Sequence, residues 1–110
     1  MTIYVLFVSD MDFIYYNMLQ YNAFLHILFN VFDCDIIVNE KCGTCIVMLL
    51  KANCDNIDID KLVEPFKHSE CNIITYARGN IDEIYIVPNG GNTCVTIVIL
   101  RCGNYDTQNV

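Results

Sequence analysis

Three short segments of this chain consist almost wholly of apolar residues, many of them β-branched or aromatic. They are residues 2–9 (TIYVLFVS), 45–51 (CIVMLLK) and 93–101 (TCVTIVILR). Each has the length of a β-strand, and none alternates apolar and polar residues as a strand with one solvated face does. We therefore expect residues 2–9 to form a buried strand with both faces covered, residues 45–51 to lie centrally in the sheet, and residues 93–101 to be a strand that is apolar on both faces.

A long amphipathic helix is predicted between the first two strands. In residues 11–33 the polar stripe at helical spacing consists of Asp12, Asn22, His26, Asn30 and Asp33, with Tyr15 and Leu19 completing the line. Asn17 lies within the opposite, apolar face and would need a hydrogen-bond partner if buried, and Asp10 or Asp12 is placed to cap the helix. A membrane span is disfavoured because the segment holds too many polar groups, namely Asn17, Gln20, Asn22, His26 and Asn30. The apolar sector is wider than one sheet face needs, which suggests that a second protomer covers the remainder.

The remaining elements define the fold class. We predict further strands at residues 35–40, 71–77 and 82–87, a short or broken helix in 58–69, where Pro65 falls, and a tight turn at 88–92 (PNGGN). The order resembles a ferredoxin-like β-α-β-β-α-β pattern extended by a C-terminal hairpin. We therefore expect a two-layer α+β sandwich with a mostly antiparallel sheet of about five to six strands and one long helix. Residues 1–101 would form a single domain, followed by a polar tail at 102–110.

Charge and composition restrict the partners. The chain has 110 residues, of which 55% are apolar, and its formal net charge is −7. So apolar a chain can offset the entropy cost of ordering, which excludes intrinsic disorder. Only six Lys and Arg residues are present, too few to neutralise many phosphates, so no nucleic acid is expected as a partner. Abundant Ile, Asn, Tyr and Phe are typical of A/T-rich genomes, among them viral ones.

The compartment is predicted from the cysteines and the N-terminus. Seven cysteines, an odd number, cannot all pair within one chain. The start of the sequence lacks the basic residues of a secretory signal, and Asp10 and Asp12 interrupt its apolar run. We expect an intracellular, cytoplasmic protein whose cysteines are mostly reduced and act as small apolar groups.

One motif, Cys42-Gly43-Thr44-Cys45, carries alternative chemistries. Together with Cys71 and His68, which form an H-x-x-C, it offers a Cys₃His set of the kind that holds structural zinc. The motif also resembles the C-G-x-C of thioredoxins, a dithiol/disulfide pair at the start of a helix, although residues 46–51 are predicted here as a strand. The interpretation that we favour is that both cysteines flank a hairpin loop as ordinary thiols.

No set of side chains in the sequence is convincing as a catalytic site. We therefore predict that the chain is not an enzyme, needs no cofactor, and serves as a small acidic protein-interaction module. It would bind a second copy of itself and another protein, in the manner of a virion or host-interaction factor if the gene is viral. The predicted interface residues are Tyr15, Tyr16, Met18 and Tyr21, because aromatic residues and Met are enriched in interfaces. The alternative function is a zinc-binding or thiol-redox protein built on Cys42 and Cys45.

Overall fold

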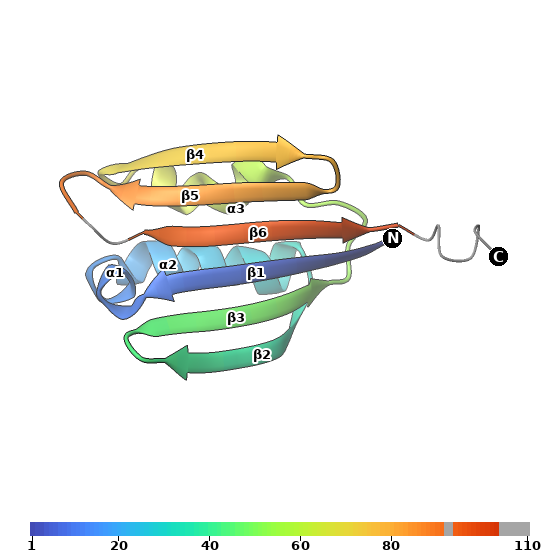
Figure 1. Ribbon diagram of the computed structural model, residues 1–110, viewed down its shortest axis with the longest axis horizontal. Coiled ribbons are helices and arrows are strands. Elements are labelled where there is room, and N and C mark those ends of the chain that lie inside the picture. Colours follow the sequence, from blue (N-terminus) through green and yellow to red (C-terminus); the bar gives the residue numbers. More distant parts are fainter. Residues whose placement is uncertain (92–93, 104–110) are drawn as a thin grey trace.

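The computed structural model describes residues 1–91 and 94–103, which form an α+β domain (Figure 1). The elements in chain order are β1 (Thr2–Asp10), α1 (Met11–Tyr16), α2 (Met18–His26), the π-helical segment η1 (Ile27–Val31), β2 (Cys34–Cys42), β3 (Cys45–Ala52), α3 (Ile59–Lys67), β4 (Cys71–Arg78), β5 (Ile81–Pro88) and β6 (Val95–Cys102). Of the expected tail, Cys102 ends β6, and residues 104–110 lie outside the described residues. Asn92 of the predicted turn and Thr93 of the predicted last strand also lie outside them.

The strands form one antiparallel sheet in the order β2-β3-β1-β6-β5-β4. The α+β class and the six strands therefore agree with the sequence analysis. The expected ferredoxin-like arrangement with an added hairpin differs in its second half. The chain forms a meander of β4, β5 and β6, and its last strand lies beside β1. As a result, β4 is left at one edge of the sheet and β2 at the other (Figure 1).

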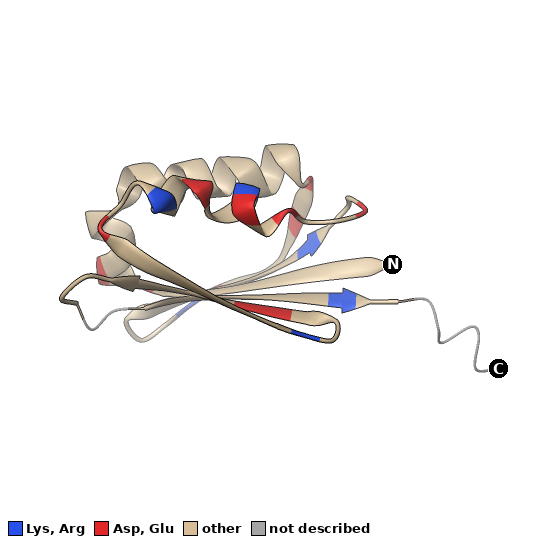
Figure 2. Cartoon of the chain, turned by 90° about the horizontal axis from the view of Figure 1, so that it is seen from above, with Lys and Arg blue, Asp and Glu red and all other residues tan. Residues whose placement is uncertain are grey.

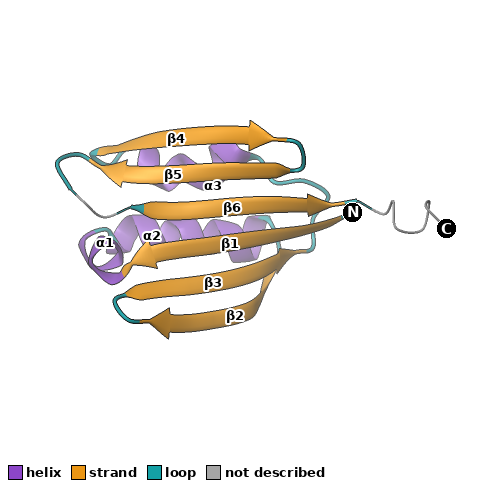
Figure 3. Cartoon of the chain, in the orientation of Figure 1, coloured by secondary structure: helices purple, strands orange, loops and turns teal. Residues whose placement is uncertain are grey.

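The predicted long helix is interrupted at Asn17. This residue leaves the helical conformation with φ −127° and ψ 43°, and its side-chain amide donates to the carbonyl of Phe13 at 2.9 Å. An Asn side chain competes in this way with the backbone bonds that continue a helix. Two helices and the π-helical segment therefore replace one continuous helix. Figure 3 shows α1 turned away from the direction of α2.

The short helix predicted in residues 58–69 is α3, and it continues through Pro65 rather than breaking there. Its start is fixed by Asp58, whose carboxylate accepts from the backbone N–H groups of Asp60 at 3.0 Å and Lys61 at 3.4 Å. An N-cap of this kind stabilises a helix by roughly 1 kcal/mol, which helps to offset the bond that proline removes. The buried side chains of α3 are Leu62, Val63 and Phe66.

The core lies between the helices and one face of the sheet. Phenylalanine rings join the two layers: the centroids of Phe7 and Phe24 are 5.2 Å apart, those of Phe24 and Phe66 are 5.5 Å apart, and Phe13 lies 5.9 Å from Phe66. Phe7 comes from β1 and the others from the three helices α1, α2 and α3. One contiguous aromatic cluster therefore connects α1, α2 and α3 to the sheet.

The helices and the sheet form two layers, but the expected cover on both faces of residues 2–9 is not supplied by the described residues of this chain. Figure 2 shows all the helices on one side of the sheet and none on the other. Accordingly, Ile3, Val5 and Phe7 of β1, which face the helices, are fully buried. Leu6 and Val8, which face the other side of the sheet, are only half-buried. We call the uncovered side the open face. The sequence misleads here because the residues on the open face are apolar as well.

Truncation of Phe24 tests the role of the aromatic cluster. Phe24→Ala should lower the free energy of unfolding by about 3–5 kcal/mol, because it removes a fully buried ring that contacts both layers. Urea denaturation followed by circular dichroism measures this change. Tyr16→Ala is the matched control, since Tyr16 is 80% exposed and its loss should change stability by less than about 0.5 kcal/mol. Equal effects of the two substitutions would contradict the packing described above.

Candidate interaction surfaces and cysteine sites

The open face is apolar across all six strands. Strand register assigns these apolar side chains to it: Val38 of β2; Val47 and Leu49 of β3; Tyr4, Leu6 and Val8 of β1; Val98 and Leu100 of β6; Ile81, Tyr85 and Val87 of β5; and Ile74 and Tyr76 of β4. Apart from Asp10 at the end of β1, the charged side chains of this face lie on the four strands outside β1 and β6: Asp35 and Glu40 on β2, Lys51 on β3, Glu83 on β5 and Arg78 on β4. The centre of the face is thus free of charge from Tyr4 to Val8 on β1.

The size of the open face matches a protein interface. Six strands about 4.8 Å apart and eight residues long at about 3.3 Å each span a projected area of roughly 600 Å². A stable interface buries about 800 Å² of accessible surface on each partner. Because a pleated surface has more accessible area than its projection, the open face approaches that size.

Charge is distributed unevenly between the two layers. In Figure 2 the acidic and basic residues gather on α3 and at the ends of elements, and much of the sheet is uncoloured. On α3, Lys67 Nζ lies 3.6 Å from Asp60 Oδ1 and 3.6 Å from Glu64 Oε2. These ion pairs are solvent-exposed and contribute little to stability. The helical side is therefore well solvated, whereas the open face offers few polar groups to water.

Three of the four predicted interface residues lie at the surface. Tyr15 is 75% and Tyr16 is 80% exposed, their rings meet edge to face at 5.5 Å, and Met18 is also exposed. Tyr21 is different, because its ring packs 5.8 Å from that of Phe7 and burial raises the pKa of its hydroxyl. Leu19, which the helical pattern placed on the polar stripe, joins the exposed group at 81%. We call Tyr15, Tyr16, Met18 and Leu19 the tyrosine patch.

The structure does not bring together the four residues suggested for zinc. Cys42 and Cys45 lie at the tip of the β2–β3 hairpin, and Cys71 begins β4 at the opposite edge of the sheet. Five steps of about 4.8 Å separate β2 from β4, so these thiols cannot share one tetrahedral ion. His68 instead lies 3.2 Å from Glu64 on α3. Within residues 1–91 and 94–103, no group of three or more His, Cys, Asp or Glu side chains is placed to hold a metal.

Cys42 and Cys45 are nevertheless direct neighbours. They are paired across the two strands and flank the two-residue turn Gly43–Thr44. Gly43 has φ +62°, which glycine adopts without strain and which a tight hairpin turn of this kind requires. Both thiols are free in the structure. The thioredoxin resemblance fails at this point, because Cys42 ends the strand β2 and the residues that follow the motif form the strand β3 instead of a helix.

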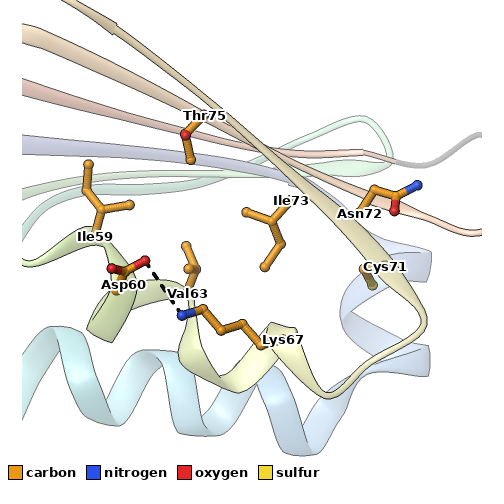
Figure 4. A pocket seen from close by; sticks show the side chains of 8 residues that line it. All are labelled: Ile59, Asp60, Val63, Lys67, Cys71, Asn72, Ile73 and Thr75. Carbon is orange, nitrogen blue, oxygen red and sulfur yellow. Dashed lines mark ion pairs between the residues drawn. The ribbon is translucent and has the colours of Figure 1, made fainter.

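A groove runs between α3 and the edge strand β4. Its volume is about 380 Å³, and its walls include Ile59, Val63 and Lys67 from the helix and Ile73 and Thr75 from the strand (Figure 4). The Lys67–Asp60 ion pair lies at its rim (Figure 4). Since β4 has no strand on its outer side in the described residues, backbone groups of β4 border the same groove. The sequence analysis did not find this feature, because it depends on β4 lying at the edge.

Two of the other cysteines, Cys34 and Cys71, are ill suited to thiolate chemistry. Cys34 is buried, and burial, assisted by the charges of Cys54, Asp33 and Asp35, raises its pKa to about 12. Burial also raises the pKa of Cys71, with a further contribution from Glu70. A thiol whose pKa is raised is a poor nucleophile and metal ligand near neutral pH.

Comparison of the chain with protein-family models, with curated proteins and with solved structures finds no match. No helix in the described residues is both long enough and apolar enough to cross a membrane. The function must therefore be argued from the surfaces and side chains described above.

Alkylation tests the cysteine environments. Iodoacetamide at pH 8 should modify the exposed Cys42 rapidly and Cys34 last, because with a pKa of about 12 only about one Cys34 thiol in ten thousand is ionised. Peptide mass spectrometry over time gives the order, and denatured protein is the control in which the difference disappears. In the unfolded chain the Cys34 thiol ionises near pH 9, whereas in the folded protein it stays protonated up to a pKa of about 12. Because ionisation then favours the unfolded state, Cys34 lowers the free energy of unfolding as the pH rises above 9. Early modification of Cys34 in native protein would contradict its burial.

Proposed function

We propose that this protein is a small, acidic, non-catalytic protein-interaction module that works as a homodimer and binds another protein on its open face. The observation that carries the proposal is the apolar, uncovered side of a six-stranded sheet. Monomeric soluble proteins rarely expose contiguous apolar patches above a few hundred Å² unless the patch has a binding role. The whole face spans roughly 600 Å² in projection, as obtained from the strand spacing, and the apolar part between its charged side chains reaches the few hundred Å² at which such patches are typically functional.

The pattern of the open face supports a protein as the partner. Its centre, with Leu6, Val8 and Val98, lacks charged side chains, whereas Lys51 and Glu83 lie farther out. Interfaces between proteins are likewise depleted of charge at the core and polar at the rim. Tyr4, Tyr76 and Tyr85 add the aromatic side chains that interfaces favour.

Tyr15, Tyr16 and Met18 stay predicted interface residues, and we add the exposed Leu19 to them, so that the tyrosine patch is a proposed second contact. Its four side chains are held by the short helices α1 and α2, and their exposure leaves them available to a partner. A role as a virion or host-interaction factor likewise stays a prediction that rests on the codon-linked composition alone. An intracellular location is a further part of the proposal.

Substitution at the centre of the open face tests the proposal. Val98→Lys should abolish partner binding, since it replaces an apolar side chain of the central strand β6, between Leu6 and Glu83, with a long charged one, while the fold persists because this side chain reaches solvent. Ala23→Lys on the exposed side of α2 is the matched control. Tagged versions of both variants and of the wild type are expressed in the source cells, and the proteins that they retain are quantified by mass spectrometry.

The expected result is a set of proteins retained by the wild type and by Ala23→Lys but lost with Val98→Lys. Direct binding of the purified partner to the three versions then gives the dissociation constants. If the same proteins bind all three versions equally, the open face is not the binding surface. If purified wild type binds none of them, the interaction function is wrong.

A second candidate function is favoured by the position of Cys42 and Cys45. Residues that flank a two-residue turn form a hydrogen-bonded pair with Cα atoms about 5.5 Å apart, within the range of about 4.4–6.8 Å found in disulfides. The two thiols can therefore give up two hydrogen atoms to a low-molecular-weight disulfide such as oxidised glutathione. The products are one internal disulfide and two molecules of reduced glutathione.

Oxidation of the purified protein tests this pairing. Incubation with oxidised glutathione should yield a peptide in which Cys42 and Cys45 are linked, and reduction should reverse it. Mass spectrometry of the alkylated digest measures the linked fraction. In Cys42→Ser the expected product is instead a mixed disulfide between Cys45 and glutathione. Stable glutathione adducts on both cysteines of the wild type would show that the internal disulfide does not form.

A further inference from the structure

We infer that β4 pairs edge to edge, in antiparallel orientation, with β4 of a second copy of this chain. The inference rests on the proposed homodimer and names the strand that joins its two copies. It leaves the open face free for another protein. The argument depends on the edge of β4, on the directions of its backbone groups and on the side chains that a twofold axis brings together.

The two edges of the sheet differ in how they resist pairing. β2 contains a bulge between Ile36 and Val38, and it carries Asp35, Glu40 and Lys41. β4 pairs with β5 without a break over eight residues, and it has no proline and no charge before Arg78. Bulges and charges are the devices that keep an edge strand from adding another strand. β2 is protected in this way and β4 is not.

Every second residue of β4 directs its backbone groups away from the sheet. Arg78 and Ile81 flank the two-residue turn of the β4–β5 hairpin and therefore form a hydrogen-bonded pair. At the other end of the hairpin, the N–H of Asn89 donates to the carbonyl of Glu70 at 2.9 Å. This bond shows that the even-numbered residues of β4 direct their backbone groups toward β5 along its whole length. The N–H and C=O groups of Ile73, Thr75 and Ala77 consequently face outward.

These three residues are self-complementary about a twofold axis at Thr75. In that register Thr75 exchanges two hydrogen bonds with Thr75 of the second copy. Ile73 faces Ala77 of the second copy, and Ala77 faces Ile73. All the outward backbone groups of the three residues are then paired, as in an ordinary antiparallel ladder.

The side chains fit the same register on both sides of the sheet. On the open face Ile74 meets Tyr76 of the second copy, and the reverse pair forms symmetrically. These are the two large apolar side chains of β4 that are most exposed, at 42% and 54%. Pairs of an aromatic and a β-branched residue stabilise neighbouring strands. The pairing would therefore cover the most exposed apolar groups of the strand.

On the helical side the groove leaves room for the incoming strand. The small side chains of Ala77 and Thr75 of the second copy would enter beside Ile73 and Thr75, which line the groove of about 380 Å³ (Figure 4). Charges do not oppose the pairing, because Arg78 would face Asn72. The nearest carboxylate of α3, that of Asp60, is already paired with Lys67 at 3.6 Å.

The consequence of this pairing is a continuous twelve-stranded sheet, six strands from each copy. Both sets of helices lie on one side of it, and the two open faces join on the other. The module would thus offer a partner twice the apolar area of one chain.

Sedimentation velocity at micromolar concentration tests the inference on the full chain. The wild type should sediment as a dimer, and Thr75→Pro as a monomer, because proline removes an outward N–H and no bond of the β4–β5 ladder. Asn39→Pro is the matched control on the edge of β2, where the N–H also faces outward, and it should remain a dimer. We call the contact between β4 and β4 of the second copy the seam. Tyr76→Lys should weaken the dimer by at least about tenfold, since it breaks both pairs with Ile74 and places a charge at the seam.

Crosslinking provides a test that does not depend on how well the proline variant folds. Thr75→Cys should form a disulfide-linked dimer under mild oxidation, in clear excess over the wild type and over Asn39→Cys. If the dimer persists in Thr75→Pro and Tyr76→Lys, and Thr75→Cys does not crosslink, the inference is overturned. Should the dimer be lost only in Val98→Lys, the copies associate by the open face instead, and the homodimer survives without this seam. A monomeric wild type would overturn both the seam and the homodimer, whereas the partner-binding function is decided by the capture experiment.

Discussion

The packing of Phe24 between Phe7 and Phe66 is the contact on which the rest of this structure depends. It connects β1, at the middle of the sheet, to α2 and α3 at once. Because the helices are held on one side, the inner strands β3, β1, β6 and β5 have one buried and one uncovered face, whereas the edge strands β2 and β4 are largely exposed. The open face is thus a direct consequence of where three aromatic rings lie.

The secondary structure was largely predictable from the sequence, but the coverage of the sheet was not. In β1 the pattern of burial alternates strictly, yet Leu6 and Val8 on the open face are as apolar as Val5 and Phe7 on the covered one. A run that is apolar on both faces indicates only that both faces avoid water. It does not distinguish cover by the chain's own helices from cover by another molecule, and the missing cover is what supports an interaction function.

The failures at the candidate sites have a common physical cause, which is that spacing along the chain does not determine position in the sheet. Cys42 and Cys45 meet because a two-residue turn joins their strands, so local sequence was enough to pair them. Cys71 was assigned to the same cluster by its motif, yet it lies at the opposite edge because β6 takes the place beside β1. The break at Asn17 depends likewise on a side-chain bond that helical periodicity does not reveal.

The position of β6 also explains why the two edges of the sheet differ. By pairing with β1 it leaves β4 as the outermost strand, and the regular β4–β5 ladder leaves that edge straight. A straight, uncharged edge rich in β-branched residues invites uncontrolled association unless a specific strand occupies it. On the other edge the same chain uses a bulge and three charged residues. A sequence that protects one edge in this way and leaves the other open is consistent with an open edge that is occupied when the protein works.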